Sequence, residues 1–201
     1  EWKLIRILQV CHKPPYPAVD GGTLAMYQIT KGLVDAGHEV HVFTMVTHKH
    51  PQPKTSIPLK GVSEEYHPID TKTKVLPAIL HLVQNQSYNV ARFDVPEVHE
   101  ALEKCLLENA FDLVHLESLF CTPYIKTIRK HSKAPIVYRS HNVEHAIWKQ
   151  LANSETKRAK KWYLEKLADQ LKDYEHEMHQ EVDAVACISP IDLAYHQSKA
   201  K

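Results

Sequence analysis

The amino-terminal part of the chain alternates between two hydrophobic patterns. Residues 4–10 are a short β-branched and apolar run, typical of a buried parallel strand. From Thr23 to Val34 apolar residues recur at helical spacing, and Gly37 is placed to end that helix. Residues 39–44 then alternate as a strand. This order predicts a βαβ unit, in which a helical crossover joins two parallel strands.

The alternation continues along the rest of the chain. It predicts further strands at 65–69, 111–117, 135–139 and 184–188. It also predicts helices at 76–84, 96–109 and 122–131, a long helix from Ser154 and a last helix from Ser189. Residues 47–60 have no periodicity and are expected to form a loop. The long helix carries one apolar stripe: Leu164, Leu167, Leu171, Tyr174, Met178 and Val182. We therefore expect a single α/β domain over residues 1–201, with a Rossmann-like open, mostly parallel sheet and helices on both faces.

Composition narrows the classes of partner and compartment. The formal net charge of +1 gives no global reason to expect nucleic-acid binding. The four cysteines are far apart and lie in or beside apolar runs, which favours buried thiols over a disulfide framework. The sequence has no run of about 20 uncharged apolar residues of the kind that spans a bilayer. We expect a cytoplasmic protein.

A proline-rich segment that ends in two glycines joins the first strand to the first helix. Gly21 and Gly22 close the segment Pro14–Gly22, directly before the helix. A helix amino terminus offers unpaired N–H groups to an anion, so this loop is a candidate phosphate-binding site. It matches neither G-x-G-x-x-G nor G-x-x-x-x-G-K-[ST], which argues against a dehydrogenase and a P-loop NTPase. The plainer alternative is that the glycines only permit a tight turn.

Polar residues follow the fourth and fifth predicted strands. Ligands of open α/β sheets bind beyond the carboxyl ends of the strands, where Glu117 and His141 are expected. His141 could hydrogen-bond a substrate or accept a proton, or it could simply cap the following helix. Asn142 and Glu144 have the same two interpretations, as ligand contacts or as a turn residue and a first-turn carboxylate.

Residues 141–145 also match H-x-x-E-H, a zinc motif of metallopeptidases. That motif requires both histidines on one helix, whereas His141 follows a strand directly. We keep the zinc peptidase as a minor alternative and expect no metal. A second surface feature is the cluster Lys157, Arg158, Lys160 and Lys161, which could contact anionic lipid or could be a solvated helix face.

Three motifs together resemble one enzyme family. The P-P-Y-P-x-x-D-G-G loop at 14–22, the phrase L-V-D-A-G-H-E-V at 33–40 and S-H-N-x-E at 140–144 resemble the N-terminal domain of GT-B glycosyltransferases. The match is to the retaining family 4, of the bacterial surface-polysaccharide type, and spans essentially the whole chain. The alternative from a different class is a non-catalytic ligand-binding α/β domain.

The resemblance implies a two-domain enzyme that transfers a sugar from a nucleotide-sugar to a saccharide or lipid-linked acceptor with retention. This half would receive the acceptor, and a C-terminal half with the family's E-x7-E segment would hold the donor. The chain ends at Lys201 without that segment, so we expect it to be inactive by itself. The resemblance also implies hexosyl transfer without a metal cofactor. A peripheral location at the inner face of the membrane, through the basic cluster, is the alternative to a purely cytoplasmic one.

The resemblance assigns roles to individual residues. Gly21 and Gly22 match the family's glycine loop, whose N–H groups approach the donor diphosphate and the acceptor. His141 matches the histidine that contacts the transferred sugar, where it would orient the sugar and stabilise charge. Weaker candidates for acceptor contacts are Tyr16, Asp20, Glu117, Asn142 and Glu144.

Overall fold

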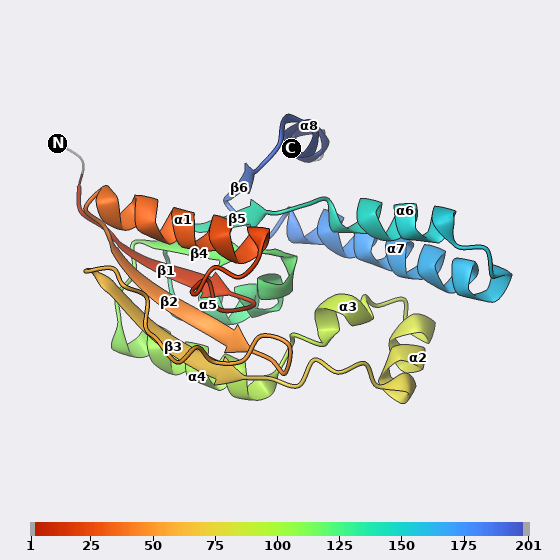
Figure 1. Cartoon of the computed structure of the whole chain (residues 1–201), viewed down its shortest axis with the longest axis horizontal. Coiled ribbons are helices and arrows are strands. Elements are labelled where there is room, and N and C mark those ends of the chain that lie inside the picture. The colour runs from red at the N-terminus through yellow and green to blue at the C-terminus, as the bar shows by residue number, and fades with distance from the viewer. Residues whose placement is uncertain (1–2, 199–201) are drawn as a thin grey trace.

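A single six-stranded parallel sheet organises the computed structural model, which describes residues 3–198 (Figure 1). The strands are β1 (Arg6–Cys11), β2 (Glu39–Val46), β3 (Val62–Pro68), β4 (Leu113–Glu117), β5 (Ile136–Ser140) and β6 (Ala184–Cys187). Their order is β3-β2-β1-β4-β5-β6, and each neighbouring pair is parallel. The chain therefore builds outward from β1 in both directions, and the order reverses between β1 and β4. The predicted open α/β sheet is confirmed.

Helices connect the strands and cover both faces of the sheet. They are α1 (Gly21–Asp35), α2 (Val75–Val83), α3 (Tyr88–Ala91), α4 (Pro96–Glu108), α5 (Ile125–His131), α6 (Glu144–Ser154), α7 (Arg158–Met178) and α8 (Pro190–Gln197), with a 3-10 helix η1 (Leu119–Tyr124) after β4. In Figure 1, α1 lies over one face of the sheet and α4 under the other, while α6 and α7 run side by side beyond it. No helix among residues 3–198 is both long and apolar enough to cross a membrane.

The two faces of the sheet bury different kinds of side chain. On the α4 face, Leu8, Val10 and Leu116 pack in the main core with Leu102 and are fully buried. On the α1 face a smaller core surrounds Met26. Because successive strand residues point to opposite faces, the buried Gln9 shares the α1 face with Cys11, two residues along β1, and with Glu117, which pairs with Cys11 in register. The α1 face thus buries polar side chains beside its smaller apolar core.

The long helix predicted to begin near Ser154 is helix α7, which begins four residues later, at Arg158. A separate helix, α6, ends at Ser154. The Glu155 carboxylate accepts hydrogen bonds from the backbone N–H groups of Thr156 and Lys157, both at 3.0 Å, and so stabilises the turn between them. A local side-chain cap of this kind leaves the apolar periodicity intact, which is why the pattern placed the start of α7 a few residues early.

Two further predictions about this region have different outcomes. The apolar stripe of the long helix is confirmed, because Leu164, Leu167, Leu171 and Met178 are buried. Val182 is past the end of α7 but still packs against the main core. The four cysteines are free thiols, and Cys187 alone among them is partly exposed.

Candidate functional site

The predicted polar segments meet at the carboxyl edge of the sheet. Glu117 is the last residue of β4, and His141 follows the last residue of β5. His12 follows β1, which lies next to β4. The His12 and His141 rings are 6.3 Å apart between centroids, in an edge-on arrangement. Three segments far apart in sequence therefore bring their strand-end residues to one place.

A fully buried carboxylate organises this edge. Glu117 has no exposed surface. Its Oε2 accepts hydrogen bonds from the Arg139 guanidinium and from His141 Nε2, both at 2.9 Å. Its Oε1 accepts a third from Gln9 Nε2 at 2.8 Å. Glu117 is buried and surrounded by three donors, so it fixes the position of its neighbours. This favours a positioning role over direct contact with an acceptor.

The network continues from Gln9 into helix α1. Thr30 Oγ1 lies 2.7 Å from Gln9 Oε1 and 3.0 Å from the Met26 carbonyl oxygen. Thr30 and Gln9 are both fully buried. Gln9 is thereby fixed in one orientation, with its amide nitrogen toward Glu117. The chain of hydrogen bonds ties the position of His141 to the packing of α1 on the sheet.

Glu117 stays ionised in these surroundings. Burial by itself raises the pKa of the carboxyl group, but the hydrogen bond from His141 and the charges of His115 and Arg139 outweigh that effect and lower it to about 2. A negative charge in the interior is tolerated because the Arg139 guanidinium is beside it. The edge of the sheet thus holds a permanent buried ion pair.

The ring of His141 is fixed by the same carboxylate. Glu117 can only accept and lies 2.9 Å from Nε2, so this shorter bond places a proton on Nε2, and Arg139 Nη1 at 3.3 Å is then a neighbouring donor that bonds to Glu117. Nδ1 is the other polar atom of the ring and is left to meet a ligand. The side chain of His141 is only 14% exposed, which keeps it in this orientation. His141 is therefore a preoriented imidazole at the edge where ligands of such sheets bind.

His12 is a member of the site that was not predicted. Its Nδ1 lies 2.9 Å from the carbonyl oxygen of Glu117 and 2.9 Å from Ser118 Oγ. A carbonyl only accepts, so Nδ1 donates and Nε2 carries the lone pair. Burial lowers the pKa of His12 to about 4 and keeps the ring neutral at pH 7. The rule that points to residues just after strands would also have found it.

The residue that holds His12 has a strained backbone. Ser118 has a φ of 133°, in the region that favours glycine. Such a conformation costs about 1–3 kcal/mol and is often found at functional sites. Here it accompanies the contact between Ser118 Oγ and His12. The sharp turn directly after Glu117 is thus part of how this edge is built.

The glycine loop begins helix α1 as expected, but an internal carboxylate already caps that helix. Asp20 Oδ1 accepts a hydrogen bond from the Thr23 N–H at 2.8 Å, and both carboxylate oxygens of Asp20 contact Lys13 Nζ. Hydrogen bonds from Lys13 and Thr23 lower the pKa of Asp20 to about 2. The amino end of α1 therefore binds an anion, and that anion is the carboxylate of Asp20.

The two glycines differ in their surroundings. A Cβ atom on Gly22 would lie 3.2 Å from both Asp20 Oδ1 and Lys13 Nζ, whereas one on Gly21 would meet nothing within 4 Å. Gly22 therefore makes room for the Lys13–Asp20 pair, and Gly21 leaves open space at the first residue of the helix. Tyr16 lies against Tyr27 of α1, with ring centroids 5.4 Å apart, and packs on the smaller core.

Asn142 and Glu144 belong to the turn between β5 and α6. Asn142 is exposed, and its carbonyl oxygen accepts a hydrogen bond from Ser140 Oγ at 2.9 Å. The N–H of Glu144 donates to Glu175 Oε1 of α7 at 2.7 Å. Burial and the nearby charge of Glu175 raise the pKa of Glu144 to about 7. Glu144 is thus a carboxyl group that titrates near neutral pH, one turn from His141.

The H-x-x-E-H segment does not assemble a metal site. His141 contacts Glu117, whereas His145 Nδ1 pairs with Glu175 Oε2 on α7. Helix α6 begins at Glu144, so His141 precedes it and the two histidines do not share a helix. Among residues 3–198, these side chains are not close enough together to hold an ion. The geometry disfavours the zinc peptidase.

A comparison of sequences identifies the family. The profile of Glycosyltransferase Family 4 matches residues 19–200. The chain belongs to this family. The match covers the end of the glycine loop, Glu117 and the segment at His141, so the resemblance to glycosyltransferase family 4 is confirmed. Among curated proteins no sequence matches significantly.

Solved structures of glycosyltransferases share the fold. Sucrose-phosphate synthase from Thermosynechococcus elongatus matches with a TM-score of 0.58 and 15% identity, over 96% of this chain and 45% of its own. Phytolacca americana UGT2 complexed with UDP-2fluoro-glucose and pterostilbene matches with a TM-score of 0.53 and 12% identity, over 96% of this chain and 50% of its own. Arabidopsis thaliana UGT89C1 complexed with UDP-L-rhamnose matches with a TM-score of 0.51 and 16% identity, over 96% of this chain and 44% of its own. The chain therefore spans about half the length of the structures that it resembles.

Proposed function

We propose that this chain is the acceptor-side domain of a glycosyltransferase that moves a sugar from a nucleotide-sugar donor to a saccharide or lipid-linked acceptor. Family membership supports the reaction class. The observation that carries the site is His141, held by the buried Glu117 at the carboxyl edge of the sheet. A second domain, outside these 201 residues, would hold the nucleotide, since the structures of similar fold are about twice as long.

In the proposed reaction, His141 contacts the transferred sugar through Nδ1. Glu117 fixes the ring, and Arg139 balances the charge of Glu117, so the imidazole needs no reorganisation when charge develops on the sugar. Neutral His12 stands beside it as a second polar contact. None of these groups need form a covalent bond to the sugar. This electrostatic role fits our proposal of transfer with retention and without a metal cofactor.

The remaining candidate residues line the entry to this site in our proposal. Gly21 and Gly22 would bring the first N–H groups of α1 toward the donor diphosphate, and Tyr16, Asp20, Asn142 and Glu144 would contact the acceptor. The exposed side of Asn142 and the open space at Gly21 support this assignment.

The test uses the full-length protein that contains this chain, with a panel of nucleotide-sugars and acceptors. We expect His141→Ala to lower kcat on the order of 10²–10³-fold, which is the usual cost of one stabilising contact. His176→Ala, which removes an exposed imidazole of α7, is the matched control and should leave kcat unchanged. Unchanged turnover in folded His141→Ala protein would refute the role of His141. The anomeric configuration of the product, read by NMR, tests retention.

We further propose that the domain contacts the cytoplasmic face of a membrane. Helix α2 exposes four large apolar side chains: Leu76, Ile79, Leu80 and Val83. Its carboxyl end is attached to α7, where Gln170 Nε2 donates to the Leu82 carbonyl oxygen at 3.2 Å. The basic cluster of Lys157, Arg158, Lys160 and Lys161 lies at the amino end of α7. Lys161 is about 14 Å from Gln170 along the axis of that helix. Apolar and basic groups thus occur at one end of the molecule, as binding to an anionic membrane requires.

Vesicle flotation tests this contact. The chain should float with vesicles that contain phosphatidylglycerol and not with pure phosphatidylcholine. Each basic residue near such a surface adds about 1 kcal/mol, so Lys157→Glu with Arg158→Glu should weaken partitioning by at least about 30-fold. Lys104→Glu is the control: it makes the same charge reversal once, on the exposed surface of α4, and should leave partitioning close to that of the wild type. No flotation at low salt would end the proposal.

A further inference from the structure

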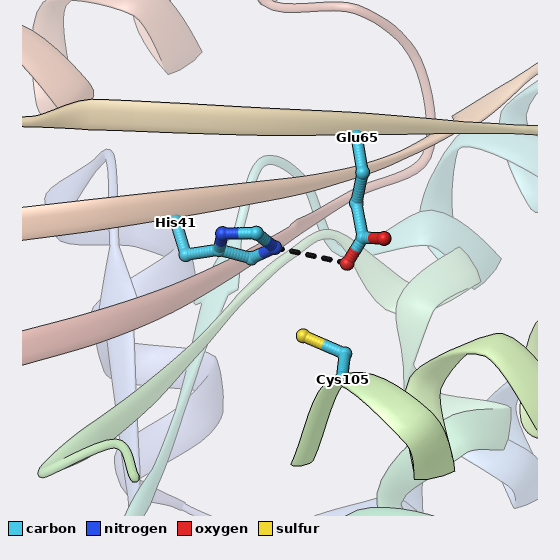
Figure 2. A group of neighbouring side chains, drawn as sticks. All are labelled: His41, Glu65 and Cys105. Atoms are coloured by element: carbon cyan, nitrogen blue, oxygen red, sulfur yellow. Dashed lines mark hydrogen bonds and ion pairs between the residues drawn. The ribbon is translucent and has the colours of Figure 1, made fainter. Parts of the chain in front are cut away.

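A histidine, a glutamate and a cysteine converge on the α4 face of the sheet, outside the site at His141. His41 comes from β2, Glu65 from β3 and Cys105 from α4. Their potential ligand atoms all lie within 4.8 Å of one another. In Figure 2 the Cys105 sulfur points from the helix toward the pair formed by His41 and Glu65. This is the one such cluster among residues 3–198.

Neighbouring side chains orient the members of this cluster. His41 Nε2 lies 2.9 Å from Glu65 Oε1, and His41 Nδ1 lies 2.7 Å from Ser63 Oγ. His67 Nε2 lies 3.3 Å from the second oxygen, Glu65 Oε2. Ser63 thus holds the far side of the imidazole and His67 the far side of the carboxylate. Metal-binding histidines and carboxylates usually have second contacts of this kind, which fix the ring and the carboxylate.

We propose that His41 Nε2, a carboxylate oxygen of Glu65 and Cys105 Sγ bind one Zn²⁺ ion. One nitrogen, one oxygen and one sulfur suit zinc, whereas Mg²⁺ and Ca²⁺ prefer oxygen ligands alone. Ligands about 2.0–2.3 Å from a tetrahedral zinc ion are under 4 Å apart. To reach this geometry the ligand atoms must approach by about 1 Å from their present separations, which are within 4.8 Å. Zinc binding displaces the proton between His41 and Glu65, and it also requires the Cys105 thiol to release its proton to solvent, because cysteine binds zinc as a thiolate.

A cleft beside the cluster leaves space for a fourth ligand. It has a volume of about 350 Å³, and its lining includes all three proposed ligands, together with His67, Lys104 and Asn109. A water molecule in this cleft would complete the tetrahedral coordination. The site therefore has three protein ligands and one position open to solvent.

The zinc site is separate from the sugar-transfer site. His41 is the third residue of β2, and its ring lies 5.8 Å from that of Phe111, just before β4 begins. The His141 site is at the opposite, carboxyl ends of the strands. The proposed zinc therefore departs from our sequence-based expectation of no metal, which was drawn from the residues around His141 and from the family's reaction. The zinc would instead bridge strands β2 and β3 to helix α4, and so would stabilise the fold by binding it and not the unfolded chain.

Cobalt(II) titration of the metal-free 201-residue chain tests the proposal, because a thiolate bound to Co²⁺ gives a charge-transfer band in the near-ultraviolet. We expect one equivalent to bind with this band, Zn²⁺ to displace it, and Cys105→Ala to abolish it. His41→Gln should weaken binding by more than about 100-fold, and Ser63→Ala by at least about tenfold. Stoichiometric Zn²⁺ should also raise the Tm.

Matched controls separate this site from the chain's other histidines and thiols. His131→Gln alters a comparable pair, since His131 Nε2 lies 3.4 Å from Glu103 Oε1 with no thiol in the cluster. Cys187→Ser removes the partly exposed thiol. Both variants should bind as the wild type does. Absence of the band in the wild type would overturn the proposal, as would its persistence in Cys105→Ala. If Cys105→Ala does not fold, unchanged affinity in His41→Gln would overturn it.

Discussion

Glu117 Oε2 lies 2.9 Å from His141 Nε2, and the glutamate that orients this ring is itself fully buried. The orientation of His141 Nδ1, the ring atom left to meet a ligand, therefore depends on the charge of Glu117, which is too deeply buried to contact a ligand itself. Arg139 and Gln9 complete the shell around that charge. The site is stable only as long as these internal groups stay paired.

Glu117→Gln should lower the free energy of unfolding by about 3 kcal/mol. The amide keeps the shape of the side chain but leaves the buried Arg139 without its counter-charge. Urea denaturation of the chain measures the change. Glu39→Gln removes one partner of the exposed ion pair with Arg6 and should cost below about 1 kcal/mol. Equal effects of the two substitutions would contradict our account of the buried pair.

His12 should make stability depend on pH. Its pKa is about 4 in the folded protein against 6.5 ordinarily, so between these values the unfolded chain binds more protons. The free energy of unfolding should therefore rise with pH across this window, by at most about 1.4 kcal/mol per unit, and the contribution is complete above pH 6.5.

His12→Asn isolates that contribution, because asparagine can replace the Nδ1 donor and does not titrate. The difference between wild type and variant, from urea denaturation at several pH values, should change between pH 4 and 6.5 and stay constant above. A constant difference throughout would show that His12 is not neutralised by folding.

Asp20 should matter to α1 mainly as its cap. Asp20→Ala should cost about 1 kcal/mol of unfolding free energy, whereas Asp20→Asn keeps a capping oxygen and should cost less. Asp35→Ala, at the other end of α1, removes an exposed pair with Lys31 and should cost less than Asp20→Ala. Thermal unfolding followed by circular dichroism would rank the three, and a smaller loss for alanine than for asparagine would exclude the capping role.

Leu102 should be among the costly core positions. It is fully buried on α4 in the main core, so Leu102→Ala should lower the free energy of unfolding by about 2–5 kcal/mol. Leu107 is on the same helix but 68% exposed, and Leu107→Ala should stay within about 0.5 kcal/mol of wild type. Chemical denaturation of both variants tests how α4 packs.

The parts of the fold that depend on periodicity were predictable. The run at 4–10 and the glycine at 37 located β1 and the end of α1, since Gly37 does adopt a positive φ of 91°. The start of α7 was predicted four residues early, at Ser154, because the turn that Glu155 stabilises through its own side chain leaves no signal in the apolar periodicity. The short helix α3 was missed as well, since four residues show no period.

The site was predictable only as positions along the strands. The rule that ligands bind at strand ends located His141 and Glu117, but it does not predict the hydrogen bond by which Glu117 fixes the ring of His141. Gln9 looked like an isolated polar residue in an apolar strand, and its role depends on the register that pairs β1 with β4. His41, Glu65 and Cys105 likewise become neighbours only when β2, β3 and α4 pack together.

The carboxylate of Asp20 at the start of α1 makes phosphate binding there an exchange. An incoming phosphate gains only the difference between its own contacts with Lys13 and the helix end and those that Asp20 already makes. A ligand with one weakly placed phosphate therefore gains little, whereas one that also contacts other groups can compensate for displacing Asp20. If this helix end binds the donor diphosphate as we propose, Asp20 would therefore favour a larger substrate that is held at several points over free phosphate.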